Sequence, residues 1–232
     1  MRSVFVALLV VGTYVAAHAQ EVMSAAYTAA LRSEVAILKQ GVVQRKVGEA
    51  DATFLRRLFP ASFKQGEPLK YAWRPSGYGP QLFFAHEDRN DSHNLGEGTE
   101  LFVLDPIQPD RYTVQVLFLE PIGDKTNLAS FFFADVNRDG QKELLALVYA
   151  EVQEVVMLEV GSGKKEKAVG RFSHWETQVF RYAGLSRAGR PRYQPDWTPR
   201  PYLNKLRSAA EVRRALVQHQ QRQKQFSTKI AK

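Results

Sequence analysis

The chain has 232 residues, a formal net charge of +8 and no cysteine. The lack of cysteine excludes a disulfide framework and catalysis by a thiol, and the sequence contains neither a G-x-S-x-G motif nor a P-loop. The hydrophobic content of 44% is ordinary for a globular protein. The length is sufficient for one sizeable core or two small ones.

Residues 1–19 have the pattern of a signal peptide. Arg2 supplies a positive charge, residues 4–17 form an apolar run, and residues 17–19 are an A-x-A cleavage signal. The run of about 14 residues is shorter than the roughly 20 that a membrane-spanning helix requires, although an uncleaved anchor is the alternative interpretation. We therefore expect an exported protein, periplasmic or secreted, with no transmembrane segment in the mature chain.

Residues 20–66 predict a helical N-terminal segment that packs on a sheet. Apolar residues recur at helical spacing over residues 24–40, and Gly41 fits a C-terminal stop. A second apolar face over residues 51–59 predicts a short helix that ends before Pro60.

A β domain is predicted for residues 67–183. It opens with a proline-, glycine- and aromatic-rich loop in which Tyr71, Trp73 and Tyr78 are expected to pack against the core, with ligand stacking as the alternative. Strands are then expected over residues 82–85, 99–104, 112–119, 128–134, 144–150, 155–160 and 172–182, with a polar turn at 161–170.

The strand pattern indicates how the sheet is built. Residues 112–119 place apolar side chains on both faces, which predicts an internal strand. The short links between the predicted strands favour antiparallel pairing. We therefore predict an α+β, mostly β fold: an antiparallel sheet or small sandwich of about seven strands, with N-terminal helices and a C-terminal helix.

Residues 184–232 predict a proline-rich connection followed by a basic helix and tail. Four prolines argue against regular structure over residues 187–201, and a capping box from Ser208 to Glu211 starts the last helix. Residues 220–232 are expected to fray.

The positive charge is concentrated near the C-terminus. From Arg181 to Lys232 the chain has 13 Lys and Arg and two acidic residues, whereas residues 20–180 hold 18 basic and 22 acidic residues. The simpler interpretation is a solvated helix and tail. The alternative is an arm that binds an anionic surface polymer, since export argues against nucleic acid as the partner.

The greatest chemical specificity lies in residues 135–143, hereafter the acidic loop. Oxygen-bearing side chains stand at alternate positions, a glycine allows the backbone to bend, and a carboxylate follows three residues later. Calcium prefers six to eight oxygen ligands, which such a loop can supply. We predict one calcium ion held by Asp135, Asn137, Asp139, the backbone carbonyl of Gln141, and Glu143. The alternative is a hairpin turn without metal, because Asx residues and glycine also favour turns.

The acidic loop differs from an EF-hand and resembles another family. An EF-hand requires a carboxylate at the twelfth position, where Ala146 stands, and the flanking residues favour strands over helices. The pattern Asp135-x-Asn137-x-Asp139-Gly140-x-x-Glu143-Leu144, between two apolar strands, resembles the calcium loop of FG-GAP/VCBS-type repeats over residues 131–150. The resemblance implies the same ligands and a loop that links adjacent strands, as in β-propeller blades. The chain has a single copy of the motif, so a whole propeller is not expected.

Two other groups of residues are candidate sites. The segment from His86 to Asn94 holds two histidines and three carboxylates and could bind a transition metal, but its spacing matches no known motif and a solvated loop is the simpler interpretation. Four glutamates would form a glycosidase pair only if the fold brought two of them together: Glu151, Glu154, Glu159 and Glu176.

The function expected from these observations is that of a non-catalytic, calcium-stabilised binding or structural module outside the cytoplasm. The alternatives are an exported hydrolase whose site is assembled from distant residues, and a protein that binds an anionic surface polymer through its basic C-terminal segment. Another exported protein is a further possible partner.

Overall fold

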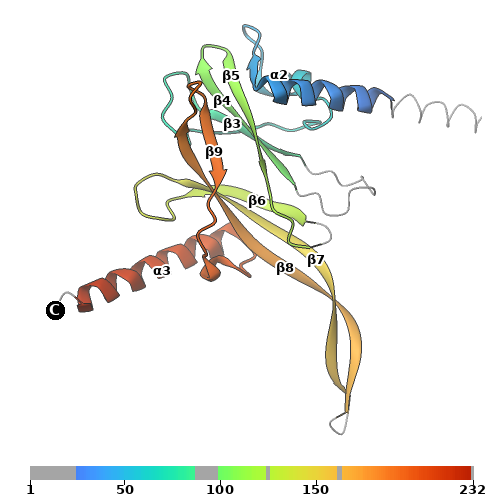
Figure 1. The fold of residues 1–232 in the computed structure, drawn as a ribbon, viewed down its shortest axis with the longest axis vertical. Helices are drawn as coiled ribbons and strands as arrows, with labels where there is room; N and C mark the ends of the chain where they lie inside the picture. The colour runs from blue at the N-terminus through green and yellow to red at the C-terminus, as the bar shows by residue number, and fades with distance from the viewer. Residues whose placement is uncertain (1–24, 87–98, 124–125, 161–163, 231–232) are drawn as a thin grey trace, which may run out of the picture.

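The computed structural model describes residues 25–86, 99–123, 126–160 and 164–230 (Figure 1). The predicted signal peptide, residues 1–19, lies outside the described residues. The chain has a mostly β, α+β fold with two antiparallel sheets, as the sequence predicted. Sheet A has the strand order β1-β5-β4-β3-β2, and sheet B has the order β6-β7-β8-β9.

The elements follow in chain order. A helix over residues 25–40 comes first. It is followed by β1 (Val42–Gln44), α2 (Asp51–Leu58), β2 (Leu69–Tyr71), β3 (Gln81–His86), β4 (Glu100–Gln108) and β5 (Arg111–Phe118). The second half contains β6 (Thr126–Ala134), β7 (Glu143–Val160), β8 (Lys164–Leu185), β9 (Pro191–Pro195), the 3-10 helix η1 (Pro201–Leu203) and α3 (Ala209–Ile230).

The elements stack as four layers: α2, sheet A, sheet B and α3. Each pair of neighbouring layers encloses a core of buried apolar side chains. Phe54 of α2 and Phe59, which directly follows α2, pack on one face of sheet A. Phe83, on the other face of sheet A, packs against Leu144 and other residues of sheet B. Val212 and Leu216 of α3 cover the outer face of sheet B. Side chains alternate between the two faces along each strand, so each sheet contributes apolar residues to the cores on both of its faces.

Sheet A confirms three predicted strands and adds two. The strands expected over residues 82–85, 99–104 and 112–119 correspond to β3, β4 and β5. Strand β5 lies between β1 and β4, so its predicted internal position is confirmed. The three-residue strands β1 and β2 were not predicted, because such short edge strands carry too little alternation to be recognised.

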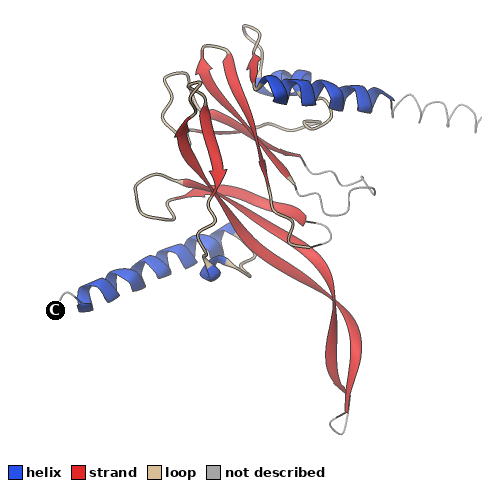
Figure 2. Cartoon of the chain, viewed as in Figure 1, coloured by secondary structure: helices blue, strands red, loops and turns tan. Residues whose placement is uncertain are grey.

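Beyond Ala150, where the pairing with β6 ends, β7 continues with β8 as a two-stranded arm (Figure 2). They pair without interruption from Leu144↔Phe180 to Val160↔Lys164, so the two strands predicted over residues 144–150 and 155–160 are one. The polar turn predicted over residues 161–170 is also wrong, since β8 already begins at Lys164. The polar residues between Ala150 and Val155 predicted a break between two strands. They can lie in a continuous strand because the arm exposes them to solvent, at least in part.

The C-terminal quarter is more regular than predicted. Pro191 and Pro195 stand at the two ends of β9, an edge strand, where a missing N–H is tolerated. Helix α3 continues to Ile230, so the expected fraying of residues 220–232 is wrong for most of that segment. Ser208 Oγ accepts a hydrogen bond from Glu211 N, as the capping box predicted. Within the described ranges, no helix combines the length and apolar character needed to cross a membrane.

A buried polar network joins the two sheets. Asp105 of β4 is 1% exposed and accepts hydrogen bonds from Arg74 Nε at 2.6 Å and Nη2 at 2.5 Å. The Tyr193 hydroxyl of β9 donates to Asp105 Oδ2 at 2.5 Å. Burial, followed by the charge of Asp105, raises the pKa of Tyr193 far above its ordinary value, so this hydroxyl remains a donor. A carboxylate this deeply buried requires such partners, and β9 supplies one from the opposite sheet.

The Tyr193→Phe substitution tests this network. It removes the hydroxyl donor but keeps the ring, so we expect the free energy of unfolding to fall by about 2 kcal/mol, as for a hydrogen bond to a charged group. Chemical denaturation measures this change. Tyr78→Phe is the control, because the Tyr78 side chain is 53% exposed and its hydroxyl contributes little. Equal stability of the two variants would contradict a structural role for the network.

Candidate functional site

The acidic loop connects β6 to β7. The two strands pair antiparallel up to Ala134↔Glu143, so Asp135 directly follows β6 and Glu143 is the first residue of β7. The structure therefore has the strand–loop–strand arrangement that the sequence predicted. The loop follows the turn geometry that its composition favours, with Arg138 at φ 66° and Gly140 at φ 84°.

The polar side chains of the loop fold back onto its backbone. Asp135 accepts hydrogen bonds from Arg138 N at 2.6 Å and from Gly140 N at 3.1 Å. Asn137 Oδ1 accepts from Asp139 N at 3.0 Å, and Asp139 Oδ1 accepts from Gln141 N at 2.7 Å. All four bonds join a side-chain oxygen to a nearby backbone N–H of the same loop. They are also the bonds of Asx turns, which form without metal.

Glu143 is the buried carboxylate of the site. Its side chain is 4% exposed, and Oε2 accepts a hydrogen bond from Val136 N at 2.8 Å. Burial raises the pKa of Glu143; the bond from Val136 N opposes this effect, and the charges of Asp139 and Asp135 add to it. The loop therefore places negative charges where each makes ionisation of Glu143 less favourable.

Three residues outside the predicted ligand set fix the position of the loop. Val136 is buried in the core between sheet B and α3. Gln220 of α3 donates from Nε2 to the carbonyl of Asp135 at 3.1 Å. Trp73, which precedes β3, donates from Nε1 to the carbonyl of Lys142 at 2.6 Å. No sequence pattern predicted the contacts of Trp73 and Gln220, because each of these residues lies far along the chain from the carbonyl it bonds, at separations of 69 and 85 positions.

The predicted ligands lie in one loop, but their carboxylates are not gathered around a point. Among the described residues, no group of three His, Cys, Asp or Glu side chains is arranged to hold a metal ion. Asp135 and Asp139 instead direct oxygens at backbone N–H groups. A carboxylate has about four lone-pair sites, so these bonds leave acceptor capacity for a cation. Small rotations of the same side chains would be needed to complete a calcium shell.

The aromatic residues near Trp73 pack in the core as expected. Tyr71 stacks on Phe133 with ring centroids 3.9 Å apart, and Trp73 stacks on Tyr193 at 4.3 Å. The prediction is wrong for Tyr78, which is 53% exposed and has no such stacking partner in the part of the chain that the structure describes, because it lies in the loop between β2 and β3.

The other predicted sites are not assembled by the described residues. Of the segment from His86 to Asn94, only His86 is described, at the end of β3; the rest lies outside the described ranges. Glu176 of β8 pairs with Val148 of β7, and Glu154 lies six positions further along β7, so the backbones of the two glutamates are about 20 Å apart along the strand. The Glu154 carboxylate is instead paired with His174, whose Nε2 lies 2.6 Å from Glu154 Oε1. Glu151 lies on the opposite face of the arm from Glu154. The side chain of Glu159 lies outside the described part of the structure.

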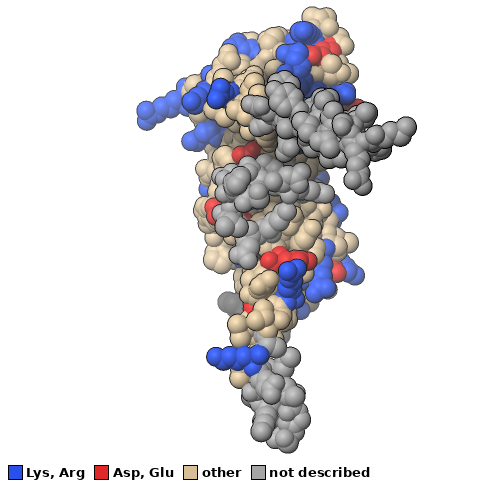
Figure 3. Space-filling view, turned by 90° about the vertical axis from the view of Figure 1, so that its right-hand side faces the viewer, with Lys and Arg blue, Asp and Glu red and all other residues tan. Residues whose placement is uncertain are grey.

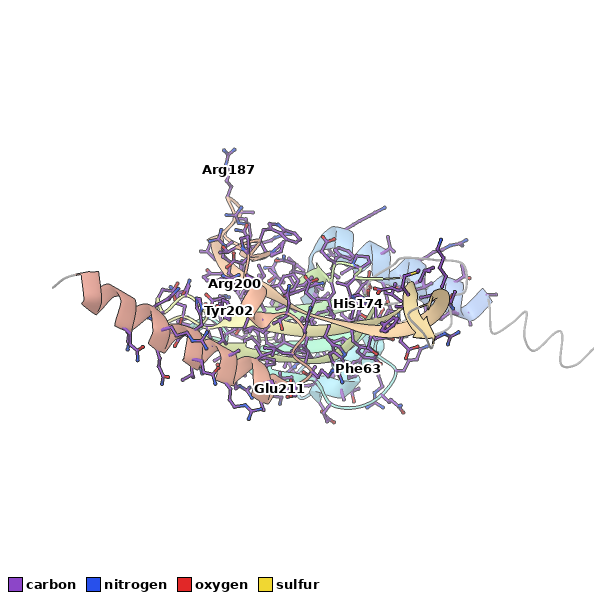
Figure 4. All side chains as sticks on the ribbon, turned by 90° about the horizontal axis from the view of Figure 1, so that it is seen from below. Phe63, His174, Arg187, Arg200, Tyr202 and Glu211 are labelled. Atoms are coloured by element: carbon purple, nitrogen blue, oxygen red, sulfur yellow. The ribbon has the colours of Figure 1, made fainter. Side chains whose placement is uncertain are left out.

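The basic residues of the C-terminal quarter occupy two places. Several lie on β8, on β9 and in the turn between them, where Arg187 projects from the side of the molecule opposite α3 (Figure 4). Others lie on α3 itself, including Arg213 and Arg214. On the face shown in Figure 3, basic side chains are spread over several separate positions and do not form one patch.

Comparisons with known proteins add no relative. No protein-family model, curated protein or solved structure shows significant similarity to this chain. The resemblance of the acidic loop to FG-GAP/VCBS-type repeats therefore stays a prediction based on the residues of the loop.

The raised pKa of Glu143 predicts a specific pH dependence of stability in the presence of a chelator. The unfolded carboxyl has the lower pKa, so it loses its proton first as the pH rises, and the folded state is progressively disfavoured. The stability that this group contributes is therefore fully present when the pH is below the pKa of the unfolded state. It is lost as the pH rises through the higher pKa of the folded state. We expect the stability of the wild type relative to Glu143→Gln to fall as the pH rises from the ordinary pKa of a glutamate through the raised pKa of folded Glu143.

Urea denaturation at a series of pH values measures this difference. Glutamine keeps an oxygen that can accept from Val136 N, so the substitution mainly removes the titration. Glu151→Gln is the matched control, because Glu151 is exposed on the arm. A wild-type advantage over Glu143→Gln that stays constant with pH would show that Glu143 does not titrate abnormally.

Proposed function

We propose that the chain is an exported, non-catalytic binding or structural module in which the acidic loop holds one calcium ion. Its ligands are the side chains of Asp135, Asn137, Asp139 and Glu143 and the backbone carbonyl of Gln141. The ion orders the β6–β7 connection and does no chemistry. Residues 1–19 support export, because they match a cleaved signal peptide.

The observation that carries this proposal is the uncompensated charge of the loop. Two cations lie within it, but neither forms an ion pair with its carboxylates among the described residues. Arg138 is directed elsewhere, with a buried Nη2 that has no hydrogen-bond partner, and its charge acts on Tyr202. Lys142 Nζ lies over the ring of Tyr71, 5.7 Å from its centroid. The negative charges of Asp135, Asp139 and Glu143 are therefore left for an external cation.

The ligand chemistry favours calcium over other metals. The loop offers only oxygen, whereas zinc and other transition metals prefer histidine or cysteine ligands. Magnesium requires a nearly ideal octahedron and gives up its water reluctantly, so it is seldom held by protein oxygens alone. Calcium accepts six to eight oxygens in a flexible arrangement, and extracellular modules bind it with dissociation constants on the order of 10⁻⁴–10⁻³ M.

The contacts of the loop favour a structural role for the ion. Trp73 and Gln220 attach the loop to the segment before β3 and to α3, so an ordered loop would stabilise contacts among several elements. Two clefts of the described structure are lined by other residues, and neither includes a residue of the acidic loop. An ion in the loop would thus lie apart from both clefts.

Calcium is expected to raise the melting temperature of the mature protein. At about 10 mM calcium and the dissociation constants above, binding stabilises the fold by about 1.4–2.7 kcal/mol. This corresponds to a rise of roughly 3–10 °C for a chain of this size. Asp139→Ala removes a ligand and should abolish the rise, which differential scanning calorimetry measures.

Two controls accompany this experiment. Glu151→Ala removes an exposed carboxylate outside the loop and should retain the wild-type rise, and magnesium at the same concentration controls for ionic strength. If wild type and Asp139→Ala respond alike to calcium, or if calorimetric titration detects no binding, the proposed ion is excluded.

A further inference from the structure

A cleft of about 320 Å³ lies at the edge of β8, beside the segment that leaves β9. Its lining comes from three parts of the chain: the end of β5 with Phe118 and Glu120, residues 176–180 of β8, and residues 195–201 with Asn204. The volume is at the lower end of the range for small-molecule sites. None of these residues belongs to the acidic loop.

The cleft forms because the segment from Asp196 to Lys205 is longer than the stretch of β8 beside which it runs. Asp196 N donates to the carbonyl of Val179 at 2.7 Å, and Lys205 N donates to the carbonyl of Trp175 at 3.1 Å. Val179 and Trp175 are four positions apart, whereas Asp196 and Lys205 are nine apart, so the returning segment must bulge away from β8. Pro199 and Pro201 lie in the bulge and have no N–H with which to pair to the strand edge.

Aromatic rings are exposed at the cleft. Trp197 and Phe118 both line it, and each side chain is 68% exposed. Tryptophan offers the best aromatic face for a cation. The two rings come from segments far apart in the sequence, so their presence at one cleft results from the packing of sheet A against sheet B.

The charge of the lining is negative. Asp196 is neutralised by Arg200, whose Nη2 lies 2.5 Å from Asp196 Oδ2, and Thr198 donates from Oγ1 to the other carboxylate oxygen at 2.7 Å. Arg200 is the single basic residue of the lining. Glu120 and Glu176 form no ion pair within the described part of the chain, so two carboxylates remain uncompensated.

Two neutral polar side chains of the lining are already used. Gln178 accepts a hydrogen bond from Glu120 N and donates to the carbonyl of Glu120, both at 2.8 Å. Thr177 donates from Oγ1 to the carbonyl of Leu203 at 3.2 Å. These contacts fix the backbone of Glu120 against β8, and its carboxylate, that of Glu176 and the exposed rings remain for a ligand.

We propose that this cleft binds an organic cation, an alkylammonium or guanidinium group that contacts the Trp197 ring and is neutralised by Glu120 and Glu176. The cation is either a free polyamine-like molecule or a Lys or Arg side chain of a peptide. This inference deepens the proposed binding role by naming a ligand class, and it does not require the calcium ion.

Calorimetric titration tests the proposal with a matched pair of probes. Nα-acetyl-lysine-N-methylamide carries the cation, and its Nε-acetylated form is the neutral counterpart. The cationic probe should bind saturably in the millimolar range or tighter and at least about tenfold more tightly than the neutral one, a difference of about 1.4 kcal/mol. Equal binding of the two probes, or no saturation by the cationic probe, overturns the proposal.

Variants locate the binding in the cleft. The double substitution Glu120→Gln and Glu176→Gln should weaken the cationic probe about tenfold, and Trp197→Leu should also weaken it, by at least about threefold, as expected for one cation–π contact. Glu151→Gln, an exposed carboxylate on the arm, should leave binding unchanged. Circular dichroism melting verifies that each variant is folded. Wild-type affinity in the double variant or in Trp197→Leu contradicts the site.

Further titrations distinguish the source of the cation and separate this proposal from the calcium site. Tighter binding of spermidine than of the lysine derivative indicates a free polyamine, whereas tighter binding of a lysine-containing tripeptide indicates a peptide; both outcomes support the cation site. All titrations are repeated with calcium and with a chelator. Cation binding that persists when calcium has no effect on melting supports the cleft and rejects the calcium site alone.

Discussion

The carboxylate of Asp105 is the constraint on which the arrangement of the two sheets depends. It is nearly fully buried, and an unpaired charge in such a place costs several kcal/mol. Arg74 and Tyr193 satisfy it, and they reach it only when the segment before β3, strand β4 and strand β9 are together. Gln81 supports the same arrangement, because its Oε1 accepts a hydrogen bond from Trp73 N at 2.7 Å. The apolar core drives the sheets together, and this network specifies how they are placed.

Both candidate sites are positioned from this network. Trp73 stacks on Tyr193 and donates to the carbonyl of Lys142, which connects the network to the end of the acidic loop. Tyr193 belongs to β9, and the chain leaves β9 directly into the bulge that forms the cleft. Gln115 pairs with both backbone groups of Tyr193, so β9 is also tied to sheet A along its backbone. Loosening β9 would therefore disturb both sites.

Local patterns in the sequence predicted the fold class, most strands of both sheets, the start of α3 and the position of the acidic loop between two strands. What they did not predict depends on contacts between distant residues. Strand β9 contains two prolines, so the sequence predicted no regular structure there, and the strand forms by pairing with β8. The sequence predicted two strands in place of the single strand β7, because Glu151, Gln153 and Glu154 interrupt the apolar pattern. Trp73 and Gln220 contact the acidic loop from distant parts of the chain. The cleft depends on two backbone hydrogen bonds to β8, from Asp196 N to the carbonyl of Val179 and from Lys205 N to the carbonyl of Trp175. No local periodicity encodes such contacts.

The acidic loop and the cleft have a common neighbour in Tyr202, the central residue of η1. Its ring stacks on His219 of α3 with centroids 3.9 Å apart, and burial raises the pKa of its hydroxyl, while the charges of Arg200 and then Arg138 oppose this effect. Arg200 belongs to the wall of the cleft, and Figure 4 shows it beside Tyr202, whereas Arg138 belongs to the acidic loop. The positive charges of Arg138 and Arg200 thus both act on the Tyr202 hydroxyl. Arg138 forms no ion pair with the carboxylates of its own loop among the described residues. Arg200 pairs with Asp196, so it does not neutralise Glu120 or Glu176. The same placement of positive charge leaves negative charge uncompensated at both sites, so the case for a cation at each is electrostatic and rests on separate carboxylates.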